Sequence, residues 1–103
     1  MNIIIEDDYL ANLVSSYPNT VGKRKFPIEV EKKFVQRISQ LMAVPTENDL
    51  RSIGALHFEK LYGEYNGKYS IRVNRSWRII FRLDKEGQIK VLFIEELNNH
   101  YKG

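Results

Sequence analysis

The chain has 103 residues, a length that accommodates one domain built around one hydrophobic core. Its net charge of +3 permits binding to a polyanion without requiring it. The absence of cysteine excludes disulfides and thiolate metal sites, and it fits a reducing cytosol. No apolar run reaches the length of a membrane span. We therefore expect a single cytoplasmic domain, residues 1–103, without membrane contact.

The N-terminal half of the sequence predicts one strand and two helices. The β-branched run at residues 1–5 is typical of a short strand, and Asp7 or Asp8 can cap the helix that follows it. Pro27 suits the first turn of a second helix, which should end near Val44 because the residue before a proline resists helical geometry. Apolar residues recur along this second helix at helical spacing: Val30, Phe34, Ile38 and Leu41.

The C-terminal half predicts an antiparallel β-meander. Residues 46–54 form a connector with at most one helical turn. Strand-like segments then follow at residues 57–62, 68–73, 77–83 and 89–95. Asp84–Gly87 has the composition of a hairpin turn. The order of elements predicts an α+β domain, with an N-terminal strand and two helices packed on one face of the meander.

Alternation along the third of these segments separates an apolar face from a cationic one. Trp77 should be buried with Ile79, Phe81 and Phe34, while Arg78 points to the opposite face. The same alternation places Arg72 and Arg82 on the face of Arg78. Guanidinium groups bind phosphate well, so this face suits a polyanion, although a half-exposed strand shows the same pattern without any function.

A family resemblance covers the stretch that contains this segment. The pattern E-K-L-Y-G…G-K-Y-S-I-R-V-N…W-R-I-I-F-R within residues 58–83 resembles HigB-type toxins of the RelE/ParE superfamily of bacterial toxin–antitoxin systems, also called plasmid-maintenance killer proteins. The similarity includes Lys23–Pro27 and Asn48–Leu50 and fades after about Gly87. It implies the same α+β fold.

The resemblance also implies an activity. Similar toxins cleave messenger RNA on the ribosome, need neither metal nor cofactor, and are neutralised by a cognate antitoxin. In such toxins the arginine of the W-R pair contacts the scissile phosphate, and this arginine is Arg78 here. Glu59 stands where some relatives have a histidine with an acid–base role. Tyr62 departs from the lysine that is frequent at its position, and Lys60 or Lys68 is a candidate to supply that charge instead.

The C-terminal tail offers a second set of candidate residues. Similar toxins end with a histidine after the last strand, commonly in an Asp-Tyr-His string. This chain has Asn-Asn-His-Tyr instead, so an acid that could orient the imidazole of His100 is missing. The resemblance implies His100 as a general acid or base and Tyr101 as a partner that stacks on a base. Either Tyr62 or Tyr65 could stack in the same way.

Two further features have structural and functional interpretations. His57 is expected to be structural, because two histidines far apart in a chain without cysteine do not predict a metal site. Cationic residues cluster around the start of the second helix and could hold ribosomal RNA through phosphates or could only increase solubility. They are Lys23, Arg24, Lys25, Lys32, Lys33 and Arg37.

Two other functions remain open for the sequence. A ParE-like poison of DNA gyrase would not need Arg78 for catalysis, and a plain RNA-binding module would use the cationic face and its tyrosines without chemistry. For the toxin, the resemblance implies as partners the ribosome, messenger RNA and a helix-turn-helix antitoxin similar to HigA. The complex with that antitoxin is expected to bind operator DNA.

Overall fold

The computed structural model describes residues 1–19 and 22–100. The first elements are β1 (Asn2–Ile5), α1 (Asp8–Ser16), α2 (Ile28–Ala43), α3 (Glu47–Ser52) and the 3₁₀ turn η1 (Gly54–Leu56). The later elements are β2 (Glu59–Lys60), the 3₁₀ turn η2 (Gly63–Tyr65), β3 (Tyr69–Arg72), β4 (Arg78–Glu86) and β5 (Ile89–Asn98). None of the helices among the described residues is long and apolar enough to cross a membrane.

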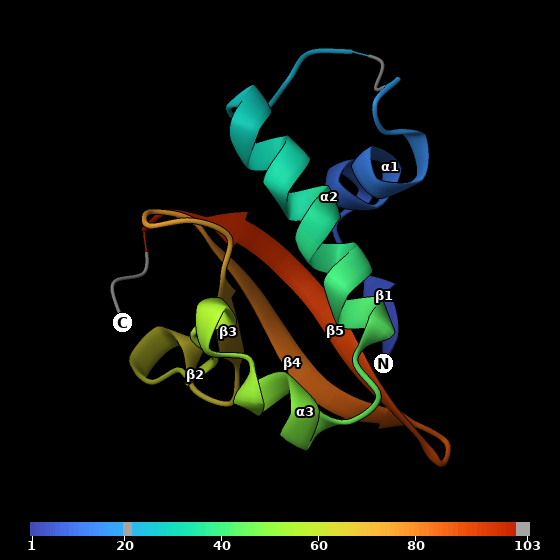
Figure 1. The fold of residues 1–103 in the computed structure, drawn as a ribbon, viewed down its shortest axis with the longest axis vertical. Coiled ribbons are helices and arrows are strands. Elements are labelled where there is room, and N and C mark those ends of the chain that lie inside the picture. Colours follow the sequence, from blue (N-terminus) through green and yellow to red (C-terminus); the bar gives the residue numbers. More distant parts are fainter. Residues whose placement is uncertain (20–21, 101–103) are drawn as a thin grey trace.

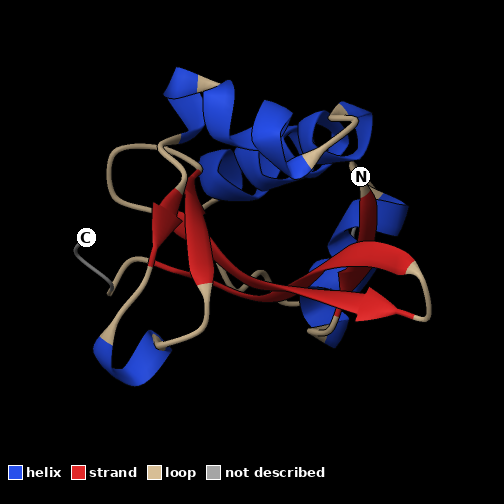
Figure 2. Cartoon of the chain, turned by 90° about the horizontal axis from the view of Figure 1, so that it is seen from below, coloured by secondary structure: helices blue, strands red, loops and turns tan. Residues whose placement is uncertain are grey.

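The strands form one sheet in the order β1-β5-β4-β3-β2. The neighbours β2–β3, β3–β4 and β4–β5 are antiparallel, as the predicted meander requires, whereas β1 pairs in parallel with β5. Figure 1 shows α2 crossing the sheet with α1 beside it. Figure 2 shows the long helix on one side of the twisted strands and the turn η2 on the other. The α+β architecture predicted from the sequence is confirmed.

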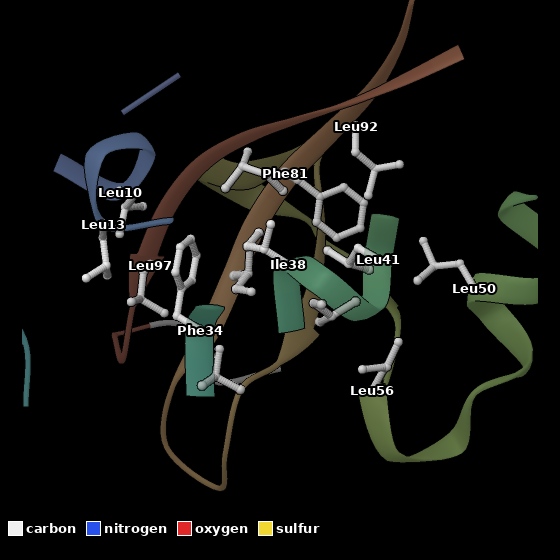
Figure 3. Close-up of a cluster of buried hydrophobic side chains, with 14 of the residues drawn as sticks. Leu10, Leu13, Phe34, Ile38, Leu41, Leu50, Leu56, Phe81, Leu92 and Leu97 are labelled. Carbon is white, nitrogen blue, oxygen red and sulfur yellow. The ribbon is translucent and has the colours of Figure 1, made fainter. Parts of the chain in front are cut away.

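The hydrophobic core lies between α2 and the sheet. Phe34 and Ile38 of α2 are fully buried against Ile79 and Phe81 of β4, and Leu10 of α1 belongs to the same cluster. Figure 3 shows Leu10, Phe34, Ile38 and Phe81 gathered between the helices and the strands. Burial of a large apolar side chain contributes roughly 1.5–3 kcal/mol, so this cluster supplies much of the stability of the fold.

Local sequence signals determine where the helices begin and end. The Asp7 side chain accepts a hydrogen bond from the backbone N–H of Leu10 at 2.9 Å, which confirms it as the N-cap of α1. Pro27 is the N-cap of α2, and α2 ends at Val44 directly before a proline, as expected. The connector contains α3, whose N-cap Thr46 accepts from a backbone N–H three residues further on.

Several strand boundaries differ from the prediction, and the last strand, expected at residues 89–95, continues to Asn98 because β4 supplies its partners. The strand expected at residues 57–62 is only Glu59–Lys60, because His57 has a left-handed backbone (φ 46°) that an extended strand cannot contain. The hairpin turn expected at Asp84–Gly87 is wrong, since β4 continues to Glu86 in register with β5. The turn itself begins at Gly87, whose φ of +62° favours glycine.

The predicted core face of β4 is mostly confirmed. Ile79 and Phe81 are fully buried, but Trp77 is only half-buried at the edge of the core. Its indole packs edge-on against the ring of Phe26, with 5.5 Å between the ring centroids. Trp77 stands before the first residue of β4, so it covers the end of the core instead of entering it.

Candidate functional site

We call the sheet face opposite the core cluster the outer face. Arg72 of β3 is the cross-strand partner of Arg78 of β4, and Arg78 is also the partner of Asn98 of β5. Residues directly opposite in this way lie about 5 Å apart on the same face. The next row along the strands holds one residue from each of four strands: Glu59, Ser70, Ile80 and Glu96. These two rows define the candidate site.

Arg78 is the most enclosed charged residue of the two rows. The sequence predicted an Arg78 presented to solvent, but the side chain is only 7% exposed. Its Nε donates to the Ser70 hydroxyl at 2.7 Å, and Nη2 donates to the backbone carbonyl of His57 at 2.7 Å. Glu59 approaches Nη2 at 3.8 Å. The hydrogen bonds to Ser70 and His57 therefore hold the guanidinium in one orientation.

His57 and Arg37 support this row through backbone contacts. The left-handed backbone of His57 aims its carbonyl at Arg78, which agrees with the structural role expected for this histidine. Arg37 of α2 donates from Nε to the carbonyl of Arg72 at 3.0 Å. The cationic cluster predicted around α2 therefore does not include Arg37, whose side chain is half-buried against the sheet.

Arg72 has an unusual environment. It is half-buried, and its Nε is a buried donor with no hydrogen-bond partner among the described residues. Like charges directly opposite in a sheet are unfavourable, and so is a buried N–H without an acceptor. An anion beside the Arg72–Arg78 pair would remove both costs. The geometry is thus suited to phosphate.

Glu96 is the centre of a polar cluster next to Arg78. The Tyr65 hydroxyl donates to Glu96 Oε1 at 3.3 Å, and Asn98 Nδ2 donates both to the same oxygen and to the Tyr65 hydroxyl at 3.2 Å. Burial, and then the charge of Glu96, raise the pKa of Tyr65 above its ordinary value. The backbone N–H of His100 donates to Asn98 Oδ1 at 3.3 Å.

This cluster therefore connects the start of the tail to the sheet, as the sequence suggested. The side chain of His100 is exposed. Tyr101 lies outside the described residues. Asn98 occupies the place where an orienting acid was missing from the sequence, and it contacts the tail through the backbone of His100, not through its ring.

A second carboxylate, Glu95, binds the cations of the outer face. Lys68 Nζ lies 2.5 Å from Glu95 Oε1, and Arg82 Nε lies 3.8 Å from Oε2. Arg82 also pairs with Glu6 at 3.2 Å and lies over the ring of Phe93 at 4.1 Å from its centroid. The hydrogen bond with Glu95 raises the pKa of Lys68. The cationic face predicted from the sequence therefore also carries carboxylates, which pair with Lys68 and Arg82.

The remaining predicted RNA contacts lie at the edge of the site. Tyr62 is 66% exposed just before η2, which leaves its ring open to a stacking partner. Lys60 is exposed and, by alternation along β2, faces the side opposite to Glu59. Neither residue is drawn into the two rows around Arg78.

The cationic segment before α2 is fixed by a buried carboxylate that the sequence did not reveal. Glu31 of α2 is 0% exposed and accepts from the Tyr9 hydroxyl and from Arg24 Nη1 at 2.5 Å. The backbone N–H of Lys25 donates to the same tyrosine oxygen at 3.1 Å. Burial and the Glu31 carboxylate raise the pKa of Tyr9. Four lysines are exposed around this anchor: Lys23, Lys25, Lys32 and Lys33.

Other features contribute no chemistry to the site. A surface hollow of about 530 Å³ lies between the N-terminus, Pro45–Asn48 and Lys90, and shares no residue with the rows around Arg78. Within residues 1–19 and 22–100, no three His, Asp or Glu side chains come close enough together to hold a metal ion.

The fold is that of RelE-type toxins. The YoeB/ParE toxin from Agrobacterium tumefaciens aligns with a TM-score of 0.58 at 18% identity, over 98% of this chain and 100% of that chain. YafQ from E. coli aligns with a TM-score of 0.58 at 11% identity, over 96% and 92% of the two chains. A YoeB–YefM complex from Staphylococcus aureus gives a TM-score of 0.54 at 23% identity, over 98% of both chains.

Sequence comparisons define the family within this fold. The family model of HigB-like toxins, described as the RelE-like toxin of the type II toxin–antitoxin system HigB, matches residues 5–97. Toxin HigB-1 of Vibrio cholerae is 35% identical over 66 residues, which are 64% of this chain and 70% of that protein. A Haemophilus influenzae protein described as uncharacterized is 34% identical over 95 residues, 92% and 82% of the two chains. The chain belongs to the HigB-like toxin family, which confirms the predicted resemblance.

Proposed function

We propose that this toxin is a ribosome-dependent endoribonuclease that cleaves messenger RNA and thereby inhibits translation. The observation that carries the proposal is the cross-strand pair Arg72–Arg78, flanked by Glu59 on one side and by Glu96 with Asn98 on the other. Paired guanidinium groups bind a phosphodiester, and carboxylates beside them can exchange protons with its ester oxygens. Membership of a toxin family supports the same activity.

The reaction requires no metal ion in this proposal. A ribose 2′-hydroxyl attacks the adjacent phosphorus, a base accepts its proton, and an acid protonates the 5′-oxygen that leaves. Arg78 stabilises the charge that develops on the phosphorus oxygens, because its orientation is already fixed by Ser70 and His57. Glu59 and His100 are the proton-transfer candidates drawn from the sequence.

The surrounding residues hold RNA. Arg72 and the cations that Glu95 binds contact phosphates, while exposed aromatic rings stack on bases. The RNA-binding set predicted from the sequence is Lys60, Tyr62, Tyr65, Lys68, Arg72, Arg82 and Tyr101. The ribosome positions the messenger, which compensates for the small number of catalytic groups.

The partners follow from the toxin–antitoxin family. We infer a cognate antitoxin, similar to HigA and with a helix-turn-helix, whose complex with the toxin binds operator DNA in the cytoplasm. A structural relative from Staphylococcus aureus is a heterotetrameric toxin–antitoxin complex of YoeB and YefM, which supports an antitoxin partner. The antitoxin neutralises the chain either by covering Arg78 or by preventing ribosome entry.

One experiment separates this function from its alternatives. The purified chain is incubated with translating ribosomes and a reporter messenger, and in parallel with DNA gyrase and relaxed plasmid. The nuclease produces cuts in the messenger only when ribosomes are present. Loss of supercoiling without cuts would identify a gyrase poison, and a salt-sensitive shift of RNA alone would identify a binding module.

A further inference from the structure

A β-bulge places two consecutive glutamates on the outer face. Ile80 pairs with Glu96 and Phe81 pairs with Ile94, so Glu95 is an extra residue in β5. Strict alternation would point Glu95 and Glu96 to opposite faces. The bulge cancels this alternation locally, and both carboxylates reach polar groups of the outer face. Bulges that redirect side chains in this way are common next to active sites.

The two glutamates have different environments. Glu95 forms ion pairs with Lys68 and Arg82, so its negative charge is already balanced by cations of the same chain. Glu96 forms no ion pair within the described part of the chain, and its contacts from Tyr65 and Asn98 both fall on Oε1. Among the described residues no donor contacts Oε2. Glu96 is half-exposed, which allows this oxygen to meet a ligand.

The position of Glu96 relative to Arg78 suits proton transfer at a phosphate. Asn98 is the cross-strand partner of Arg78, and Glu96 lies two residues earlier on the same face, about 7 Å along the strand. Glu59 approaches Arg78 from the opposite direction, from β2. An in-line displacement needs its base and its acid on opposite sides of the phosphorus, and these two directions satisfy that requirement.

We propose that Glu96 is the proton acceptor for the attacking 2′-hydroxyl, and that Tyr65 and Asn98 are positioning residues that orient its carboxylate. The inference rests on the proposed ribonuclease activity. The 2′-oxygen forms a bond to phosphorus as its proton passes to Glu96 Oε2. The bond from phosphorus to the 5′-oxygen breaks, and that oxygen takes a proton from the acid on the other side. The products are a 2′,3′-cyclic phosphate and a 5′-hydroxyl end.

Other titratable groups face Glu96 and must be separated from it. They are Tyr65 from η2, Lys68 before β3, Arg78 from β4 and Glu95 on the same strand. Lys68 and Arg78 carry positive charge on this face, and Glu95 carries a second negative charge. A glutamine at position 96 keeps the Oε1 acceptor for Tyr65 and Asn98 but cannot accept a proton, so it isolates the basicity of Glu96.

The test compares Glu96→Gln with Glu95→Gln in single-turnover cleavage of messenger on ribosomes, across pH. Glu96→Gln should lower the maximal rate about 100-fold or more, as expected for loss of a general base, and should remove the ascending acidic limb of the pH–rate profile. Ribosome binding should be unchanged. Glu95→Gln should alter the concentration dependence through Lys68 and Arg82 but retain that limb.

Each outcome has one meaning. If Glu96→Gln cleaves at the parental rate with the same acidic limb, Glu96 is not the proton acceptor, but the proposed ribonuclease activity is still supported. If the limb disappears in Glu95→Gln and persists in Glu96→Gln, the roles of the two glutamates are reversed. If the parental chain does not cleave messenger on ribosomes, both the proposed ribonuclease activity and the role of Glu96 are wrong. A fold check by circular dichroism accompanies each variant.

Discussion

Among the residues that the structure describes, two charged side chains are buried, and they are held in different ways. Glu31, on the helix side, is 0% exposed and accepts from Tyr9 and from the guanidinium of Arg24. Arg78, on the outer face, is 7% exposed and donates to a hydroxyl and a backbone carbonyl. The guanidinium of Arg24 lies 2.5 Å from Glu31, whereas the carboxylate of Glu59 lies 3.8 Å from Arg78.

The difference separates a structural charge from one that is available for chemistry. A full charge at short distance cancels the field of Glu31, so this group serves to attach the segment before α2. Arg78 is oriented by Ser70 and by the His57 carbonyl, with Glu59 3.8 Å from its Nη2, and a guanidinium oriented in this way can stabilise charge that develops on a substrate. Burying either side chain removes a charge from water, which costs free energy. In Glu31 this burial fixes a segment of the fold, and in Arg78 it fixes the orientation of a guanidinium.

The largest effect is expected from removing the partner of Glu31. Arg24→Ala leaves the fully buried Glu31 carboxylate with only the Tyr9 hydroxyl, and we expect a cost of about 3 kcal/mol because the remaining charge is buried, although Arg24 itself is 41% exposed. Urea unfolding at neutral pH measures the free energy of unfolding. Lys32→Ala, at an exposed position of the same region, is the control and should change it by less than about 0.5 kcal/mol. An equally small change in both variants would show that water replaces Arg24.

The next effect concerns the fixed guanidinium. Arg78→Lys keeps the positive charge but cannot donate to Ser70 and His57 together in the same geometry. We expect the cleavage rate on ribosomes to fall on the order of 100-fold, the usual cost of losing one oriented donor in the transition state. Single-turnover cleavage measures this rate, and thermal unfolding monitors the fold. Full activity in a folded Arg78→Lys variant would show that only the positive charge at position 78 matters, and not the oriented guanidinium.

A smaller effect is expected in the tail. His100→Gln should slow messenger cleavage about tenfold and spare ribosome binding, less than the usual contribution of a general acid, because the side chain is exposed and water can donate instead. The pH–rate profile should lose one limb, because glutamine cannot transfer a proton. His57→Gln is the matched control, since that histidine acts through its backbone carbonyl. Parental kinetics in His100→Gln would assign the acid role to Glu59.

The smallest effect is expected at Glu47, which forms half-exposed ion pairs with Lys90 and Arg51. Its effect on stability can be compared with that of the two buried charges. Hydrogen bonds from Lys90, and then from Arg51, lower the pKa of Glu47 below its ordinary value of 4.5. A carboxyl with a lowered folded-state pKa stabilises the fold above the unfolded value, and this contribution is lost as the pH falls through the folded value. Glu47→Gln should therefore cost up to about 1 kcal/mol at pH 7, with the difference from the parental chain shrinking below about pH 4. Urea unfolding at both pH values measures this difference. A constant difference would attribute the effect to packing.

The sequence predicts the fold well where periodicity is regular. Alternation placed Ile79 and Phe81 in the core, and the Asp7 cap and the end of α2 follow from local rules. Prediction from the sequence fails where the pairing of distant segments determines the length of a strand. Strand β4 continues through Asp84 because β5 supplies the partners, and no local signal overrides the turn-like composition there.

The candidate site was predicted only in part, for the same reason. The sequence identified Arg78, Arg72 and Glu59, which the structure brings together. It did not identify Glu96. Alternation assigns consecutive residues to opposite faces, whereas the β-bulge inserts Glu95 as an extra residue, and this insertion is visible only in the pairing with β4. It also expected Arg78 to be solvent-exposed, since the carbonyl that covers it comes from a residue 21 positions away.

The parallel pairing of β1 with β5 has a consequence for the order in which the toxin matures. During synthesis the first strand leaves the ribosome with no partner, and it must wait until residues 91–94 have been made. The same late strand carries Glu96 and Asn98, so the sheet is completed and the site is assembled at one moment. Contacts between the two ends of a chain also form slowly. The candidate site of a nascent chain is thus incomplete until residues 91–98 have been made and have paired with β1 and β4.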